Sequence, residues 1–448
     1  MSKHAKTEDQ AALECAEVMR HRWRYDHTEG LWFHYDGYIW RRAQKAEGLL
    51  EVRGLCTAMA SEIEARTGDP QTTMRTARYF RSVESLVQID PRIATTSASW
   101  DADPRIMAAP FAHFTSGRPT PPDAARMTTR HTGATPPPDP DHDGPQCPRW
   151  RRFLAEATAG DRDLVHYLQS LAGYCATGLT REQTFWFIFG PGGSGKSLFL
   201  DTLRAALGTY ALSVPAEFFE VRHQDPHPEE MARLMGVRLV TASETRPGKT
   251  WNETRIKQIT GDGSITARFM RQNTFEFAPQ CKLIIAGNHQ PRLRIVDAAM
   301  QRRMRVIPFV TIPPTPDPKL SDALRAELPG IVAWIAEGTM HYLSSGLPMP
   351  EVVRRHTADY MEGQDIIGAW IAECTATLAG AFTAAGSLYD SYGEFCREQG
   401  EHPVSSRTLT EQLELRGWRR SRNKASRGFD GVRIIPRELP LQARQYER

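Results

Sequence analysis

The fold is decided by Gly190-Pro191-Gly192-Gly193-Ser194-Gly195-Lys196-Ser197, which fits the phosphate-binding pattern G-x-x-x-x-G-K-[ST]. An apolar run, Phe185 to Phe189, precedes it, and leucines at helical spacing follow it. Glycines let successive backbone N–H groups curl around a phosphate, and the helix N-terminus adds its positive dipole end. In that geometry Lys196 reaches the β- and γ-phosphates and the Ser197 hydroxyl ligates Mg²⁺. The stretch therefore predicts a P-loop that binds ATP and Mg²⁺.

A glycine-rich turn could match this pattern by chance, but the expected strand and helix on either side both favour the P-loop. A second apolar run, from Arg238 to Ala242, leads to Glu244. A P-loop enzyme needs a carboxylate on a neighbouring strand to hold Mg²⁺ or the attacking water. We therefore expect Glu244 to be the metal ligand, the general base or both. An ordinary solvated glutamate after a core strand is the other explanation.

A third apolar run, Lys282 to Gly287, ends at Asn288. Asn288 is expected to orient the attacking water or sense the γ-phosphate, and it equally suits the start of a turn. Arg302 and Arg303 precede a further strand, Val306 to Phe309. In a ring they could reach a neighbouring subunit's γ-phosphate, a contact typically worth about 10³–10⁵ in rate. A solvated basic helix end explains the two arginines equally well.

Residues Ile265 to Phe277, between the second and third of these runs, predict a β-hairpin with a polar, basic tip. Lys257, Arg268 and Arg271 could hold a DNA backbone inside a ring pore. Taken alone, this segment is better explained as a surface hairpin with ordinary charge.

The composition is that of a soluble globular protein: 40% of the 448 residues are hydrophobic and 24% are charged, enough for two or three domains. No apolar run is long enough to span a bilayer, and the polar N-terminus has no secretory signal, so we expect a cytoplasmic protein without membrane contacts. The seven cysteines are scattered and never form a Cys-x-x-Cys pair, which argues against a disulfide framework and a zinc site.

A net charge of +3 is too small to imply nucleic acid by itself, and the distribution of charge is more informative. Basic residues gather near the C-terminus, at Arg416, Arg419, Arg420, Arg422, Lys424, Arg427 and Arg433.

Apolar strands and helical segments alternate from about Phe185 to Phe309, which predicts a parallel sheet covered by helices. Nearer the N-terminus, the stretch Trp32 to Trp40 predicts a β-hairpin that turns at Asp36-Gly37, and Gly54 to Thr67 is predicted to be helical. Prolines interrupt the chain from Thr115 to Pro148, as in a linker or an extended strap.

These features, in this order, resemble superfamily 3 helicases, and more closely the C-terminal half of phage/plasmid primase–helicases, the group that includes the poxvirus primase–helicase. Besides the P-loop, the resemblance lies in Trp32 to Trp40, Cys147 to Tyr174, Lys257 to Arg268, Lys282 to Pro291, Asp297 to Phe309 and Leu328 to Trp334. It implies an AAA+-like α/β P-loop NTPase with an N-terminal α+β helicase-associated domain and a C-terminal winged-helix-like domain. The expected boundaries are 1–114 for the N-terminal domain, 115–148 for a proline-rich linker, 149–180 for a helical collar, 181–310 for the ATPase core, 311–375 for a helical lid and 376–448 for the basic C-terminal domain.

The resemblance further implies an ATPase and DNA helicase of a phage, satellite or plasmid replication system, which hydrolyses ATP at the subunit interfaces of a homo-hexamer and translocates on single-stranded DNA. By position, the resemblance implies that Lys196 and Ser197 bind phosphate and Mg²⁺, that Glu244 is the acidic residue at Mg²⁺ and that Asn288 is the sensor. It implies that Arg302 or Arg303 is an arginine finger acting in trans. Contacts with DNA in the pore are expected from Lys257, Arg268 and Arg271, and contacts with duplex DNA from Arg419, Arg420, Arg422 and Lys424.

Two departures from the family leave other functions open. Ser194 stands where the family usually has asparagine, which could weaken turnover. No primase domain is apparent, so priming is expected from a separate primase or polymerase. The alternatives are a P-loop ATPase that remodels or loads partners at DNA, and a nucleotide-dependent DNA-binding regulator without unwinding activity.

Overall fold

The computed structural model of the chain describes residues 4–137, 147–221, 228–243, 249–261, 263–268, 274–293, 297–423 and 426–435. The chain forms two units, one of Met1–Pro291 with Arg302–His356 and the other of Arg292–Gln301 with Thr357–Arg448. All seven cysteines are buried. Among the helices of the described ranges, none combines the length and the apolar character needed to cross a bilayer.

The centre of the first unit is a five-stranded sheet in which every neighbouring pair of strands is parallel. In spatial order its strands are β14 (Met304–Pro308), β8 (Phe185–Phe189), β13 (Lys282–Gly287), β10 (Leu239–Ala242) and β9 (Ala211–Ser213). β10 and β13 are buried along their whole length, as expected for strands covered on both faces. The predicted α/β fold with a parallel sheet is confirmed.

The strand order corrects the expectation that the acidic strand lies beside the P-loop strand. β10, which leads towards Glu244, is separated from β8 by β13, which pairs with both. Strands joined by crossover connections need not be neighbours in space, so sequence order does not fix this arrangement. The strand next to β8 on this side is instead the one that leads to Asn288.

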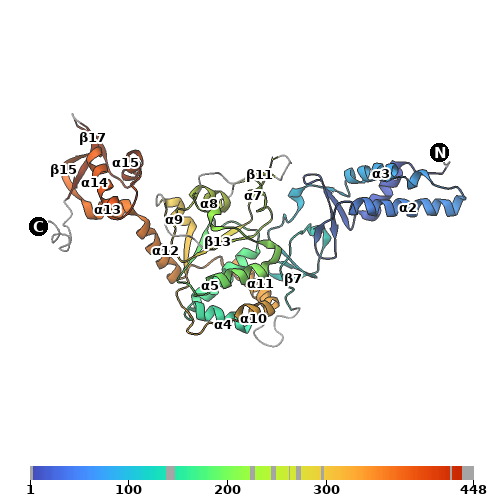
Figure 1. Ribbon diagram of the computed structural model, residues 1–448, viewed down its shortest axis with the longest axis horizontal. Coiled ribbons are helices and arrows are strands. Elements are labelled where there is room, and N and C mark those ends of the chain that lie inside the picture. Colours follow the sequence, from blue (N-terminus) through green and yellow to red (C-terminus); the bar gives the residue numbers. More distant parts are fainter. Residues whose placement is uncertain are drawn as a thin grey trace. The chain divides into compact units, whose positions relative to one another are not determined.

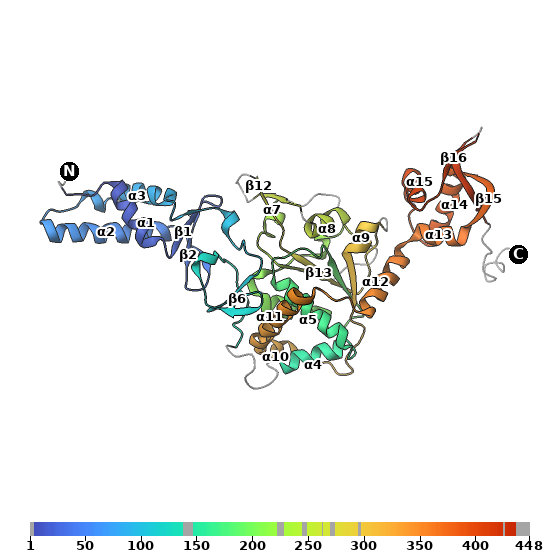
Figure 2. The same ribbon diagram turned by 180° about the vertical axis from the view of Figure 1, so that it is seen from behind.

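Helices cover both faces of the sheet, with α5 and α11 on one side and α8 on the other (Figures 1 and 2). Alternate residues of β8 point to opposite faces. Trp186 and Ile188 join the main hydrophobic core, whereas Phe185 and Phe187 contact Trp251 beside α8. The helices around the sheet are α4 (Pro148–Ala157), α5 (Arg162–Ala176), α6 (Lys196–Leu207), α7 (Pro228–Ala232), α8 (Glu253–Thr260), α10 (Leu320–Ala326) and α11 (Leu328–Ser345).

Helices α5 and α11 approach each other closely at two glycines. A Cβ on Gly173 would lie 2.0 Å from the carbonyl carbon of Gly338, and a Cβ on Gly338 would lie 2.1 Å from the carbonyl oxygen of Gln169. The side-chain amide of Gln169 also donates to the carbonyl oxygen of Trp334 at 3.1 Å. Only glycine permits this spacing, so these positions fix how the helical layer packs.

Two buried cations hold the C-terminal end of α5. Arg238, just before β10, donates to the carbonyl oxygen of Ala176 at 2.6 Å, and its guanidinium lies 4.2 Å from the ring centroid of Tyr210. Lys282, the first residue of β13, donates to the carbonyl oxygen of Thr177. Burial lowers the pKa of the Lys282 ammonium to about 7. Cationic donors suit the negative end of a helix dipole, which explains two such costly residues in a core.

The N-terminal part of the first unit packs helices α1 (Glu8–Met19), α2 (Glu47–Thr67) and α3 (Ala77–Ile89) beside a sheet of β3 (Trp40–Arg42), β2 (Leu31–Tyr35), β1 (Trp23–Asp26) and β4 (Ala94–Thr95). The predicted β-hairpin is confirmed, with Tyr35 opposite Trp40. Its turn is held by Asp36, whose Oδ1 accepts from the N–H groups of Tyr38 and Ile39 at 3.2 and 3.1 Å. The helix predicted from Gly54 begins earlier, as α2.

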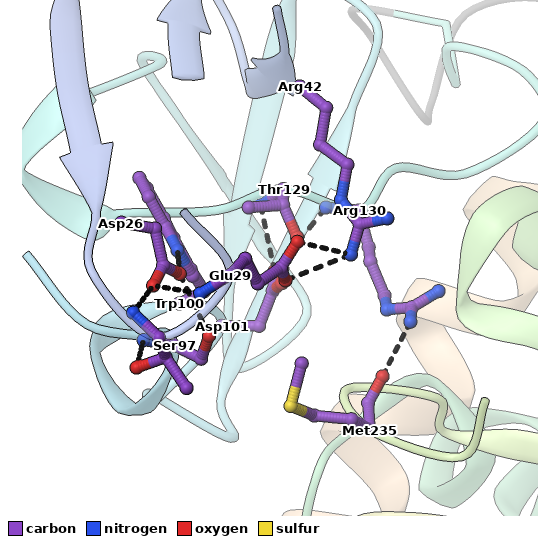
Figure 3. A network of polar contacts seen from close by, with 10 residues as sticks. Asp26, Glu29, Arg42, Ser97, Trp100, Asp101, Thr129, Arg130 and Met235 are labelled. Carbon is purple, nitrogen blue, oxygen red and sulfur yellow. Dashed lines mark hydrogen bonds and ion pairs between the residues drawn. The ribbon is translucent and has the colours of Figure 1, made fainter. Parts of the chain in front are cut away.

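A three-stranded sheet is formed by β5 (Ile106–Ala109), β6 (Ala112–Thr115) and β7 (Arg118–Thr120). Its last strand lies inside the proline-rich segment, 115–148, which is therefore not a linker from its first residue. After β7, and apart from a short 3-10 helix at Ala124–Arg126, the described part of the segment up to residue 137 is a strap without regular secondary structure. The carbonyl oxygen of Thr128 accepts from the N–H of Trp40 at 2.7 Å, on the N-terminal sheet. The guanidinium of Arg130 donates to the carbonyl oxygen of Met235 at 2.5 Å, on the core (Figure 3). The strap therefore bonds to both parts of the first unit.

The second unit is built from α13 (Ile366–Cys374), β15 (Thr375–Ala384), α14 (Ala385–Glu398), α15 (Ser406–Leu415), β16 (Arg420–Arg422) and β17 (Arg427–Ile434). Its antiparallel sheet has the order β15-β17-β16. Trp370, Leu388, Leu409 and Phe429 belong to its hydrophobic core. The structure also describes α9 (Ala298–Arg303), α12 (Glu351–Gln364) and the hairpin of β11 (Ile265–Arg268) with β12 (Thr274–Phe277). This hairpin confirms the one predicted there.

Candidate functional site

The glycine-rich loop joins the end of β8 to the first residue of α6, as predicted. Gly193 and Gly195 have φ of +81° and +88°, a region that side chains other than glycine rarely adopt. A Cβ on Gly190 would lie 1.8 Å from the carbonyl oxygen of Phe309, and a Cβ on Gly195 would lie 2.7 Å from the ring of Phe153. The loop thus needs glycine for conformation and for space.

An anion fits the end of this loop. Lys196 begins a helix of 12 residues, and the first N–H groups of a helix have no partner within the helix. Ser197, in the first turn, is exposed, as are Gly192 and Gly193. Together with the helix dipole, these exposed groups form an arrangement that binds phosphate in proteins, and a serine hydroxyl there is a suitable Mg²⁺ ligand.

Lys196 itself is folded back onto the loop and is only 6% exposed. Its Nζ donates to the carbonyl oxygens of Gly190 and Pro191 at 2.9 and 2.6 Å and to the Oγ of Ser194 at 3.2 Å. Ser194, also buried, donates from Oγ to the carbonyl oxygen of Pro191 at 2.9 Å. Burial lowers the pKa of the Lys196 ammonium. The ammonium must leave these acceptors to reach a phosphate.

The sensor candidate lies at the same edge of the sheet as the loop. Gly287, the last residue of β13, is in register with Phe189, the last residue of β8. Asn288 therefore follows at the edge where the loop begins, and it is exposed. Ala242 is in register with Ile285, so β10 ends at this edge as well. Glu244, predicted to supply the acid, lies outside the described residues.

The two arginine candidates lie at the opposite edge. β14 is parallel to β8, with Met304 in register with Phe185, and Arg302 and Arg303 directly precede that first residue. Five residues of strand span roughly 16 Å. Arg302 is exposed and Arg303 is half-buried. Within one chain these arginines are therefore remote from the loop, and Arg302 is the more exposed of the two.

A cleft of about 720 Å³ adjoins the loop at Gly193 to Gly195. Its other walls are α4, through Arg149, Arg152 and Phe153, and a proline-rich segment, residues 311–317. This volume lies within the range of about 300–1,000 Å³ that small-molecule sites occupy. The cleft is large enough for the nucleoside part of a nucleotide whose phosphates lie on the loop. The sequence assigns residues 311–317 to a helical lid, and it does not predict their place in the wall of this cleft.

The end of α4 that borders the cleft is fixed by a carboxylate. The N–H groups of Arg149 and Trp150 each donate to the side chain of Glu327 at 3.0 Å. Arg149 also forms an ion pair with Asp317, in the proline-rich wall. The ion pair joins the two walls of the cleft.

The DNA-contact candidates are spread over both units. Lys257, on α8, is half-buried with Nζ 3.8 Å from the carboxylate of Glu253. Arg268, at the end of β11, is exposed, whereas Arg271 lies outside the described residues. In the second unit Arg419, Arg420 and Arg422 are exposed, Arg420 donates to Glu414 at 3.2 Å, and Lys424 lies outside the described residues.

Comparison with known proteins places this arrangement in context. Residues 15–159 match the family described as D5 N terminal like, and residues 188–303 match a family of unknown function, DUF5906. A protein of Acanthamoeba polyphaga mimivirus named putative helicase is 25% identical over 245 residues, which are 49% of this chain and 26% of the viral protein. Putative helicase 022R of Frog virus 3 (isolate Goorha) is 32% identical over 138 residues, 30% of this chain and 14% of that protein. The resemblance to the phage/plasmid primase–helicase family is confirmed.

The chain matches about a quarter or less of the length of these two viral relatives. A solved structure, the apo form of the C-terminal region of NrS-1, superimposes with a TM-score of 0.51 at 10% identity, covering 94% of this chain and 99% of that one. The likeness to NrS-1 is one of fold. The likeness to the primase–helicase family rests on the D5 N terminal like match and on the two viral relatives. The end of β8, the loop, α6 and Asn288 lie in the match to DUF5906.

Proposed function

We propose that this chain is an ATP-dependent DNA helicase of a phage, satellite or plasmid replication system, which hydrolyses ATP at the subunit interfaces of a ring and translocates on single-stranded DNA. The main support is the separation of the candidate groups between two edges of one sheet. The glycine-rich loop and Asn288 lie at one edge, and the exposed Arg302 lies at the other. One chain cannot bring this arginine to its own loop, so a second copy would complete the site.

Each group then has a role. The loop N–H groups and Lys196 bind the phosphates of ATP, Ser197 and Glu244 hold Mg²⁺, and Asn288 orients the attacking water. When bound, Mg²⁺ neutralises charge that develops on the phosphate oxygens. Arg302 of the neighbouring copy adds charge at the γ-phosphate. The cleft between α4 and the proline-rich segment takes the nucleoside.

DNA contacts are proposed for both units. Lys257, Arg268 and Arg271 belong to α8 and the β11–β12 hairpin, and we place this region in the pore of the ring, at single-stranded DNA. The second unit runs helix, strand, helix, helix, strand, strand from α13 to β17. This order supports a winged-helix-like domain that contacts duplex DNA.

The test is the ATPase rate of the full chain with and without single-stranded DNA. We expect DNA to stimulate hydrolysis and Lys196→Ala to reduce it to background, because the lysine is the only loop side chain that brings a positive charge to the phosphates. Strand displacement on a forked duplex then separates a helicase from an ATPase that only remodels or loads partners. A rate that single-stranded DNA leaves unchanged contradicts the translocase.

A second candidate, a nucleotide-dependent DNA-binding regulator, is favoured by one observation. Ser194 and Lys196 are bonded to each other and to the loop carbonyls, and asparagine is usual in the family at the position of Ser194. A regulator would bind nucleotide tightly with turnover near background. Ser194→Asn separates the two: a large rise in turnover with unchanged nucleotide affinity would identify Ser194 as the residue that slows hydrolysis.

A further inference from the structure

Two arginines in the second unit face each other on one hairpin. Arg422 of β16 and Arg427 of β17 are directly opposite in the antiparallel register, and both are exposed. Like charges in directly opposed positions destabilise a sheet. Among the residues that the structure describes, neither arginine has an ion-pair partner. A polyanion bound at this place would remove the repulsion.

The hairpin is held firmly enough to present these side chains. A Cβ on Gly428 would lie 2.1 Å from the carbonyl oxygen of Thr383, so β17 packs against β15 more closely than any other residue allows. Arg420 is opposite Phe429, which is buried in the core of the unit. Since opposed and alternate residues share a face, Arg422 and Arg427 lie on the face of Phe429, beyond the core.

The exposed face of α15, in contrast, is not basic. Arg407 pairs with Glu411 at 2.9 Å, and Glu414 accepts from Arg420 at 3.2 Å. The helix therefore has two exposed carboxylates and one arginine, whose charge is already neutralised. Carboxylates beside DNA phosphates repel them, so α15 is poorly suited to enter a groove.

The aromatic side chains near the hairpin pack against one another. Trp418 and Phe429 contact each other with ring centroids 5.8 Å apart, and Trp418 contacts Trp370. Surfaces that bind single strands combine basic groups with aromatic rings on which bases stack. The rings near this hairpin pack in the core of the second unit and are not available to stack on bases. The basic hairpin is therefore better suited to bind the phosphate backbone of a duplex than to bind single-stranded DNA.

We propose that the β16–β17 hairpin binds the phosphate backbone of duplex DNA through Arg422 and Arg427, and that α15 does not contact base edges. Binding by this unit is therefore independent of DNA sequence, because phosphate contacts position a protein without distinguishing bases. The inference rests on the proposed role at DNA but concerns a surface separate from the ATP site.

The experiment uses the full chain without nucleotide and measures fluorescence anisotropy on a labelled 30-base-pair duplex, on a shuffled duplex of equal composition and on a single strand. The double variant Arg422→Ser with Arg427→Ser is expected to weaken duplex binding roughly ten- to hundredfold at 0.1 M salt. The slope of the logarithm of the binding constant against the logarithm of the salt concentration should fall in magnitude by about 2, one unit for each lost phosphate contact. The two duplexes are expected to bind equally.

The matched control is Arg407→Ser with Glu411→Ser, which leaves the net charge unchanged and alters only α15. We expect it to bind like the unchanged chain. The hairpin variant should melt at the same or a slightly higher temperature, since it removes a repulsion, and this excludes unfolding as the cause of lost binding. The inference is wrong if the α15 variant loses more affinity, if one duplex binds more than about tenfold tighter, or if the arginines matter only for vesicles of acidic lipid.

The outcome is separable from that of the proposed function. If the hairpin variant loses duplex binding and single-stranded DNA does not stimulate the ATPase, the hairpin site is supported and the translocase proposal is overturned. Stimulated ATPase with unchanged duplex binding in the variant would do the reverse.

Discussion

At the scale of single residues, Gly195 in the loop is restricted both by its backbone conformation and by a neighbouring side chain. Its φ is +88°, and a Cβ would lie 2.7 Å from the ring of Phe153. We expect Gly195→Ala to lower the free energy of unfolding by about 1–3 kcal/mol and to weaken ATP binding, because the strained backbone would shift the loop. Gly192→Ala is the control, since a Cβ there meets nothing within 4 Å. Equal urea midpoints for the two variants would contradict the argument.

Lys282 gives a prediction about pH. Burial lowers the pKa of its ammonium from 10.5 to about 7, so above pH 7 the unfolded chain binds a proton that the folded chain has released. Stability from this residue therefore rises with pH, starting near pH 7. We expect the free energy of unfolding to rise between about pH 6.5 and 8, below the range where the buried thiols begin to titrate in the unfolded chain. Urea unfolding of Lys282→Met should show a flatter pH dependence over that interval, and an equal slope would show that Lys282 does not cause it.

At the scale of elements, the contact of α5 with α11 depends on Gly173. A Cβ there would lie 2.0 Å from the carbonyl carbon of Gly338, so Gly173→Ala must push the helices apart. We expect a loss of about 1–3 kcal/mol in the free energy of unfolding, as for overpacked cores. In α2 a Cβ on Gly54 meets nothing within 4 Å, and Gly54→Ala should stabilise by about 0.5–1 kcal/mol through helix propensity. Thermal melts of the two variants should shift in opposite directions.

Elements were more predictable from the sequence than their arrangement. Local signals located the loop, the strand before it, the helix after it and the hairpin at Asp36, because turn residues and apolar periodicity act over short distances. The insertion of β13 between β8 and β10 depends on crossover connections, which leave no local signal. The cleft beside the loop was missed for a related reason, since its walls come from α4 and residues 311–317, far apart in the chain.

At the scale of the whole molecule, the candidate groups lie at two opposite edges of the sheet, and the proposed function requires two subunits to complete one site. The sequence predicts that Lys196 and Asn288 act at the phosphates of their own subunit and that Arg302 or Arg303 acts at those of a neighbour. The register shows that the first two share an edge and the third does not. Which copy of the chain supplies the arginine therefore depends on how the copies assemble, and mixing inactive variants tests this directly.

The test mixes two inactive variants, Lys196→Ala and Arg302→Ala, each of which should hydrolyse ATP at background rate alone. If Arg302 acts across an interface, a site with lysine from an Arg302→Ala chain and arginine from a Lys196→Ala chain is complete. Random mixing at equal amounts makes about a quarter of the interfaces complete. About a quarter of the activity of the unchanged chain should therefore return if sites act independently in a head-to-tail ring. If the arginine acts within its own chain, neither variant has a complete site and nothing returns. The matched control mixes Arg303→Ala with Lys196→Ala. We expect Arg303→Ala alone to keep its ATPase activity, because Arg302 supplies the contact. If Arg303→Ala is inactive alone and ATPase activity returns in its mixture with Lys196→Ala, the contact across the interface involves the half-buried Arg303.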